Sequence, residues 1–161
     1  MRRVTVSLVF ASAFVIGILG HANAQATDPW IGTWTLNIQK SQYEPASLAP
    51  KSQTTKQTAA GDAVTAITDG TDAKGKPLHT EITYRFDGKE YEYKGAPDPK
   101  STRTYTRIGS NVYQFVNKVD GKITTTSRVT VSPDGKTRTI VTTGRDAQGN
   151  VVSNVSMWDK R

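Results

Sequence analysis

The sequence predicts an all-β protein, an antiparallel up-and-down meander of about eight to ten strands that closes as a barrel or folds as a sandwich. Three observations support this prediction. From Gly32 onward, short runs rich in threonine, valine and tyrosine alternate with glycine-containing turns, and β-branched and aromatic side chains suit a pleated surface. The turns recur at the even spacing that is typical of meanders. No stretch after residue 24 keeps a 3.6-residue apolar period, so a helical domain is not expected.

Turn residues divide the chain into its expected strands. Asp-Gly pairs at 87–88, 120–121 and 134–135 indicate two-residue hairpins, because Asp and Gly tolerate the positive φ of such turns. The D-A-x-G sequences at 72–75 and 146–149 predict four-residue loops that end on a glycine. The runs between the turns predict ten strands, at residues 32–38, 52–59, 63–70, 77–86, 89–94, 101–108, 112–119, 122–132, 136–145 and 150–159.

Alternation of apolar and polar residues identifies the buried face of some strands. Along 77–86, Ile82 and Tyr84 share a face with other apolar residues while charged residues occupy the opposite face, as in an antiparallel sheet that is wetted on one side. Segments 52–59 and 101–108 show no continuous apolar face. A closed barrel accommodates such strands if its interior holds polar groups and water.

Residues 39–51 interrupt the meander. Two prolines and the lack of alternation predict a loop, with one helical turn begun by Ser41. Two interpretations of this loop remain open. It is either a lid over a barrel mouth, with Tyr43 and Leu48 as its apolar contacts, or a plain surface connection.

The first 24 residues are typical of a cleavable secretory signal peptide. Arg2 and Arg3 give a basic start, and residues 4–20 are uncharged and apolar. Ala22 and Ala24 then place small residues at the −3 and −1 positions of a cleavage site. A membrane anchor is the alternative, but the apolar run is shorter than the roughly 20 residues that usually span a bilayer. We therefore expect a secreted or periplasmic protein, with membrane contact only through the uncleaved signal.

Cleavage after Ala24, or two residues later at a second small-residue site, leaves 25–161 as a single domain. The chain has no cysteine, which excludes disulfides, thiolate nucleophiles and sulfur-ligated zinc. Its net charge of +7 comes from basic residues spread along the sequence, whereas nucleic-acid binding concentrates them on one face, so no nucleic-acid partner is expected. The apolar content of 35% is low, which predicts a thin core or a partly hydrated interior.

Gly32-x-Trp34, at the start of the first expected strand, resembles the G-x-W signature of the lipocalin-like, or calycin, β-barrels, among them small bacterial secreted proteins that are largely uncharacterised. The resemblance implies a barrel around a small-molecule cavity, and ten strands would fit a fatty-acid-binding-protein-like barrel better than an eight-stranded lipocalin. It also implies that Trp34 packs at the closed end under a basic residue, for which Lys160 and Arg161 match by position and Arg145 less well. The T-D-Y turn of lipocalins has no counterpart here, and the R-x-Y clamp of fatty-acid-binding proteins is absent from the last expected strand.

Candidates for catalysis or metal binding are few. His79 is the one histidine after the expected signal and shares a strand face with Glu81, but zinc needs three or four protein ligands. Glu90 and Glu92 lie on one face of one strand, so they cannot flank a sugar bond from two sides. Each turn aspartate stands alone in its loop, far short of the ligands that calcium takes. We expect no catalytic residue, no metal site and no cofactor.

Arg103-x-Tyr105-x-Arg107 is the group of residues that best suits a ligand. Two guanidiniums beside an aromatic ring fit an anionic head group. The alternative is an exposed outer face, on which the arginine stems cover apolar surface. With aromatic residues of neighbouring strands and one further arginine, the candidate ligand-binding set comprises Tyr84, Tyr91, Tyr93, Arg103, Tyr105, Arg107 and Arg128.

Three functions are compatible with this sequence. The leading hypothesis is a secreted, non-catalytic protein whose barrel binds a small amphipathic or lipid-like ligand. The second is an interaction module that meets an envelope protein or a polysaccharide through its outer face or a free strand edge. The third is an enzyme of an unrecognised type, in which His79 would be the available imidazole.

Overall fold

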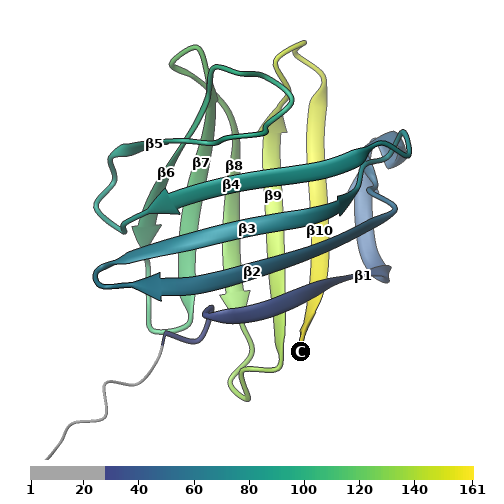
Figure 1. Ribbon diagram of the computed structural model, residues 1–161. Coiled ribbons are helices and arrows are strands. Elements are labelled where there is room, and N and C mark those ends of the chain that lie inside the picture. The colour runs from purple at the N-terminus through teal and green to yellow at the C-terminus, as the bar shows by residue number, and fades with distance from the viewer. Residues whose placement is uncertain (1–27) are drawn as a thin grey trace, which may run out of the picture.

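The computed structural model describes residues 28–161, so the expected signal peptide lies outside the described residues. The described chain forms ten antiparallel strands in one sheet, in the order β4-β3-β2-β1-β10-β9-β8-β7-β6-β5 (Figure 1). The strands are β1 (Gly32–Glu44), β2 (Ser52–Ala60), β3 (Ala63–Thr71), β4 (Pro77–Tyr84), β5 (Glu90–Glu92), β6 (Ser101–Arg107), β7 (Val112–Val119), β8 (Lys122–Val131), β9 (Thr137–Arg145) and β10 (Val151–Lys160). The predicted all-β meander is confirmed. Within residues 28–161, no helix has the length and apolar character needed to cross a membrane.

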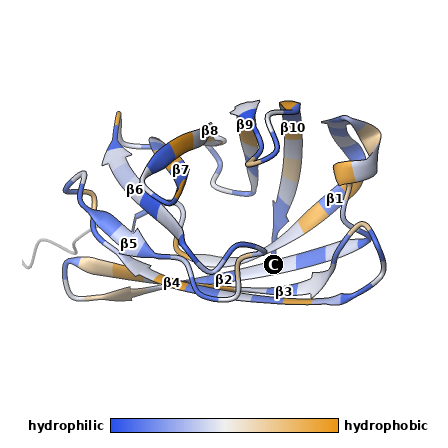
Figure 2. Ribbon diagram, turned by 90° about the horizontal axis from the view of Figure 1, so that it is seen from above, coloured by the Kyte–Doolittle hydropathy of each residue, from blue (hydrophilic) through white to orange (hydrophobic). Residues whose placement is uncertain are grey.

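The sheet curves into a nearly closed barrel, the architecture of lipocalin-like and fatty-acid-binding-protein-like folds. β2, β3 and β4 run across β6 to β10 (Figure 1), and seen from above the two groups of strands surround a common interior (Figure 2). β1 and β10 pair along most of their lengths. The two ends of the sheet, β4 and β5, are joined by only one isolated bridge. In it the backbones of Glu81 and Lys94, just beyond β5, exchange two hydrogen bonds of 3.1 and 3.0 Å.

The first strand is longer than expected, and the prediction of a loop over 39–51 is wrong for its first half. β1 continues to Glu44 across an irregularity that begins after Asn37. There the Ser41 hydroxyl donates to the Asn37 carbonyl at 2.7 Å and accepts from the Met157 amide at 2.9 Å. A side chain thus replaces the missing ladder bonds, and pairing with β10 resumes beyond the irregularity.

A short 3-10 helix, η1 (Ala46–Leu48), follows β1. The expected helical turn therefore exists, but it begins at residue 46 and not at Ser41. β5 is also shorter than the expected 89–94, since only Glu90–Glu92 pair with β6. Both differences occur where tertiary pairing, and not the local sequence pattern, decides how far a strand runs.

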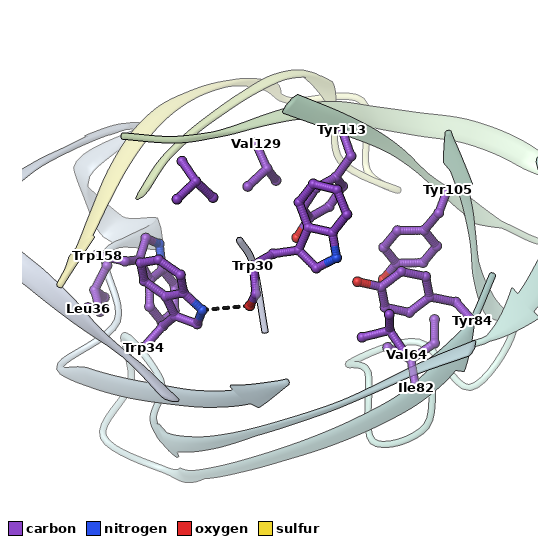
Figure 3. Close-up of a cluster of buried hydrophobic side chains, with 11 residues drawn as sticks. Trp30, Trp34, Leu36, Val64, Ile82, Tyr84, Tyr105, Tyr113, Val129 and Trp158 are labelled. Atoms are coloured by element: carbon purple, nitrogen blue, oxygen red, sulfur yellow. Dashed lines mark hydrogen bonds between the residues drawn. The ribbon is translucent and has the colours of Figure 1, made fainter. Parts of the chain in front are cut away.

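Three tryptophans pack at the closed end of the barrel. Trp30 and Trp34 are fully buried, and the Trp34 indole N–H donates to the Trp30 carbonyl at 2.8 Å. Figure 3 shows Trp34 beside Trp158, with Trp30 inserted between that pair and the tyrosines Tyr84 and Tyr105. The segment before β1 thus fills the interior at this end and leaves free space only further along the barrel.

Polar contacts hold residues 28–31, the plug at the closed end of the barrel, in place. Asp28 accepts two hydrogen bonds from the guanidinium of Arg107, at 2.9 and 2.8 Å, and the Lys160 ammonium donates to the Pro29 carbonyl at 3.3 Å. Gly32 has φ +133°, and a Cβ at this position would lie 2.6 Å from Cε of Lys160. The backbone conformation of this position therefore favours glycine, while the flexible Lys160 side chain could move away from a larger residue.

Candidate ligand-binding cavity

A cavity of about 220 Å³ lies inside the barrel. Side chains at the inward positions of most strands line it. Its walls combine aromatic rings, aliphatic groups, hydroxyls, amides and two guanidiniums, and within residues 28–161 they include no carboxylate. The lining residues are Tyr43, Gln53, Thr55, Gln57, Ala66, Thr68, Thr80, Ile82, Tyr84, Tyr93, Arg103, Tyr105, Tyr113, Phe115, Arg138, Ile140, Thr142, Asn154, Ser156 and Trp158.

The polar strands of the sequence explain why the cavity is polar. β2 has no apolar face, and its inward residues Thr55 and Gln57 are both buried. The hydroxyl of Thr55 pairs with that of Thr68 at 2.9 Å. On β8, Ser127 pairs with Thr142 of β9 at 2.8 Å. These side chains satisfy one another, so this part of the barrel wall is polar without leaving these hydroxyls unpaired.

Arg138 of β9 is the most unusual residue of the cavity. Its side chain is only 3% exposed, and its guanidinium carbon lies 4.9 Å from the Trp34 ring and 4.6 Å from the Trp158 ring. One terminal nitrogen donates to the Gln57 carbonyl oxygen, while the buried Nε has no hydrogen-bond partner within residues 28–161. Burial lowers the pKa of Arg138 to about 10. The group is therefore still a cation at neutral pH.

Gln57 connects Arg138 to the tyrosines of the opposite wall. Its amide nitrogen donates to the Tyr84 hydroxyl at 2.9 Å while its carbonyl oxygen accepts from Arg138. This chain fixes the orientation of the Gln57 amide, because both of its ends are occupied. Burial raises the pKa of Tyr84 well above its ordinary value. The Tyr84 hydroxyl consequently stays protonated and can serve as a donor in the cavity.

Arg103 of β6 is the second cation of the cavity. Its guanidinium carbon lies 3.6 Å from the Tyr93 ring and 4.7 Å from the Phe115 ring, and its Nε donates to the Asn117 side-chain carbonyl at 2.6 Å. Asn117 is itself held, because its amide donates to the Thr125 hydroxyl at 2.8 Å. Arg103 is thus preorganised by aromatic faces and by a fixed hydrogen bond.

Stacked tyrosines form the apolar wall between these cations. The rings of Tyr84 and Tyr105 lie 3.5 Å apart with an interplanar angle of 10°. Tyr105 also packs against Phe115 at 5.7 Å and Tyr113 at 6.3 Å. Burial raises the pKa of Tyr105, although the nearby Arg103 opposes the shift. The wall therefore offers flat apolar surface with neutral hydroxyls at its edge.

The structure brings four of the seven expected ligand-binding residues to the cavity: Tyr84, Tyr93, Arg103 and Tyr105. The exposed-face alternative therefore does not hold for Arg103 and Tyr105, which point inward. The deciding observation is that both residues, together with Phe115 opposite Tyr105 on β7, line the cavity. The other side of this strand carries the threonines.

The remaining three expected residues lie outside the cavity lining. Tyr91 is half-buried against the core, and its hydroxyl donates to Asp87 at 2.9 Å. Arg107 is exposed at the closed end, where it binds Asp28. Arg128 is exposed on the outer face of β8. Of the R-x-Y-x-R sequence, Arg103 and Tyr105 therefore line the cavity, whereas Arg107, the last residue of β6, contacts the segment before β1 at the closed end.

The closed end contains the expected tryptophan and a covering lysine. The Lys160 ammonium lies 5.2 Å from the Trp34 ring centroid. Arg161 donates its backbone amide to the Thr33 carbonyl at 2.9 Å. Arg145 is the last residue of β9, and its side chain donates to the Gly149 carbonyl. Lys160 thus lies over the Trp34 ring, as the buried Arg138 also does.

Of the two residues expected to act as a lid, Tyr43 and Leu48, only Tyr43 lines the cavity. Tyr43 lines the cavity from the irregular end of β1, whereas Leu48 of η1 is 38% exposed and takes no part in the lining. Burial raises the pKa of Tyr43, and a hydrogen bond with Ser156 opposes that shift. The segment after β1 thus contributes a wall residue, and η1 itself is a surface connection.

The weak catalytic and metal candidates occupy ordinary surface positions. His79 is exposed and pairs with Asp69 at 2.7 Å, and Glu90 pairs with Lys118. Asp72 and Asp146 accept hydrogen bonds from the amides of their own loops. Among the described residues, no three acidic or histidine side chains group as a metal site.

Comparison with known proteins adds no assignment, since no family model matches the chain and no curated protein is significantly similar to it. The functional argument therefore depends on the cavity. Two of its principal residues, Arg138 and Gln57, were missed by the sequence analysis. Both lie on strands whose two faces are polar, so alternation gave no indication of which face is inside.

Proposed function

We propose that this protein binds a small amphipathic molecule with an acidic group inside its barrel, and that it does so without catalysis. The observation that carries the proposal is the buried guanidinium of Arg138, which faces a cavity without carboxylates and keeps an unpartnered Nε. A buried cation is costly unless it is paired and hydrogen-bonded. An acidic ligand would supply both the negative charge and the missing acceptor.

The rest of the cavity fits the apolar part of such a molecule. The stacked Tyr84 and Tyr105 rings and the Ile82 and Ile140 side chains supply apolar contact. At about 220 Å³, the cavity lies below the roughly 300–1,000 Å³ of pockets for drug-sized ligands. The ligand is therefore small, and the cavity does not fit a long-chain lipid.

A purely structural role for Arg138 is the competing explanation. Its stacking on Trp34 and Trp158 stabilises the closed end to some degree. Trp34 is, however, also covered by the exposed Lys160, whose ammonium remains in contact with solvent. A second, fully desolvated cation at the same ring is not needed for covering it, which favours a ligand role for Arg138.

We further propose that binding takes place outside the cytoplasm. The proposal derives from the N-terminal sequence, in which a basic start, an apolar run and small residues at 22 and 24 are typical of a signal peptide. The structure adds that Asp28 is already fixed to Arg107. Cleavage near residue 24 would leave only a short segment before the folded barrel.

A native mass spectrum of the protein, purified from its secreted fraction without organic solvent, tests both proposals. We expect the mass of a chain that begins at residue 25 or 27, plus a discrete added mass that disappears on solvent extraction. The extracted compound should migrate as an acid. A full-length chain would contradict secretion by cleavage, and a neutral or cationic extracted compound would contradict the acidic ligand.

A further inference from the structure

We infer that the ligand carries two anionic groups, one at each end, and that Arg138 and Arg103 bind one group each. This inference rests on the proposed function, because it requires that the barrel binds an acidic molecule. It goes further by assigning a second binding position and by naming the class of ligand, an elongated small molecule with an acid at both ends.

The first argument is charge. Two guanidiniums line a single cavity, and within residues 28–161 neither forms an ion pair with a carboxylate. The ion pairs of the described chain involve other residues, among them Arg85 with Asp62 and Arg107 with Asp28. A ligand with one acid would neutralise one of the two cations and leave the other uncompensated.

The second argument is that the Arg103 guanidinium is held in a fixed orientation, as ligand-binding groups are. Tyr93 and Phe115 pack against its guanidinium, and the Nε is fixed by Asn117, which Thr125 fixes in turn. This arrangement occupies the faces of the guanidinium and its Nε. The terminal nitrogens contact no carboxylate within residues 28–161, and the Tyr105 hydroxyl lies beside them. An acid bound by these nitrogens would therefore also meet the Tyr105 hydroxyl.

The third argument is the separation of the two arginines. By strand register Arg103 lies opposite Asn117 of β7, and Arg138 lies opposite Val131 of β8. The Val131 amide donates to the carbonyl of Asn111, the residue directly before β7. The two levels differ by six residues, roughly 20 Å at 3.3 Å per residue, and the long arginine side chains shorten the gap. One small anion cannot occupy both positions, whereas an elongated diacid can.

The space between the two positions belongs to the same cavity. Tyr113 lines the cavity together with both arginines. The stacked rings of Tyr84 and Tyr105 lie in the same wall. A chain or ring that connects two acids would therefore lie against aromatic surface.

A calorimetric titration series tests this inference. The probes are octanoate and the straight-chain α,ω-dicarboxylates with 4 to 12 carbons, and the proteins are the wild type, Arg103→Gln, Arg138→Gln and the outer-face control Arg128→Gln. We expect affinity along the diacid series to reach a maximum at one length, at least about tenfold tighter than octanoate. Arg103→Gln should remove that gain, so that this variant binds the best diacid no more tightly than it binds octanoate. Arg138→Gln should weaken both classes, and Arg128→Gln neither.

The outcomes separate this inference from the proposed function. If octanoate binds and no diacid binds more tightly, the protein is an acid-binding barrel and the two-ended ligand is wrong. If Arg103→Gln weakens octanoate as much as the best diacid, both arginines serve one acidic group, which also overturns the inference. If neither class binds to the wild-type protein, the proposed function fails and the inference fails with it. Circular dichroism of each variant verifies that the barrel is intact.

Discussion

Replacing Arg138 with methionine is expected to lower the affinity for octanoate by at least about 100-fold and to change the free energy of unfolding by less than about 1 kcal/mol. The loss of affinity follows from removing a desolvated charged partner, which costs on the order of 2–5 kcal/mol in binding. The small effect on stability follows from two opposed changes. Methionine removes the cost of burying a cation, but it leaves the Gln57 carbonyl oxygen without its donor.

Calorimetric titration and urea unfolding of the same preparations measure the two effects. Arg128→Met is the matched control, because Arg128 is exposed on the outside of the barrel, and neither quantity should change for it. A stability loss above about 3 kcal/mol with unchanged octanoate affinity would show that Arg138 is a structural residue. It would remove the observation on which the proposed function depends.

Replacing Trp34 with alanine is expected to lower the free energy of unfolding by about 3–5 kcal/mol, the range for buried tryptophan-to-alanine changes. Trp34 is fully buried, and its indole donates to the Trp30 carbonyl. Its ring also lies against the Arg138 guanidinium and the Lys160 ammonium. The substitution therefore removes packing, a buried hydrogen bond and two cation–ring contacts at one end of the barrel.

Urea unfolding measures this effect against two further variants. Trp34→Phe keeps a ring but loses the indole N–H, so it should cost less than Trp34→Ala. Ile123→Ala is the surface control, since Ile123 is 67% exposed, and should stay within about 0.5 kcal/mol of the wild type. A Trp34→Ala variant as stable as Ile123→Ala would mean that the closed end contributes little to the fold.

Local turn chemistry made the fold predictable from the sequence. Asp120-Gly121 forms the expected two-residue hairpin between β7 and β8, and both of its residues have positive φ. The hairpin expected at Asp87-Gly88 is wrong, because β4 already ends at Tyr84 and meets the following segment only through a single bridge. Asp134-Gly135 lies in a loop longer than two residues, which the Ser132 amide closes on the Thr137 carbonyl. The continuation of β1 was not predictable in this way. It depends on the Ser41 hydroxyl meeting the Met157 amide, two residues 116 positions apart, and no local pattern reports such a contact.

The candidate site was predictable only in part, and for a physical reason. Tyr84 stands out because its strand alternates apolar and polar residues. Arg138 does not, because β9 places threonine or arginine on both of its faces. Only closure of the barrel determines that Arg138 is inside. When a cavity is lined by polar side chains, its strands lose the apolar–polar alternation by which the inward face could be recognised.

The central claim is that the cavity selects an anion, and a comparison of octanoate with octan-1-ol tests it most directly. The two molecules share a chain length and differ in charge, so calorimetric titration of the wild-type protein with each isolates the contribution of the acid. We predict saturable binding of octanoate at one site per chain, at least about tenfold tighter than binding of the alcohol. Equal affinities, or tighter binding of the alcohol, would contradict the claim and show that the arginines do not recognise the ligand.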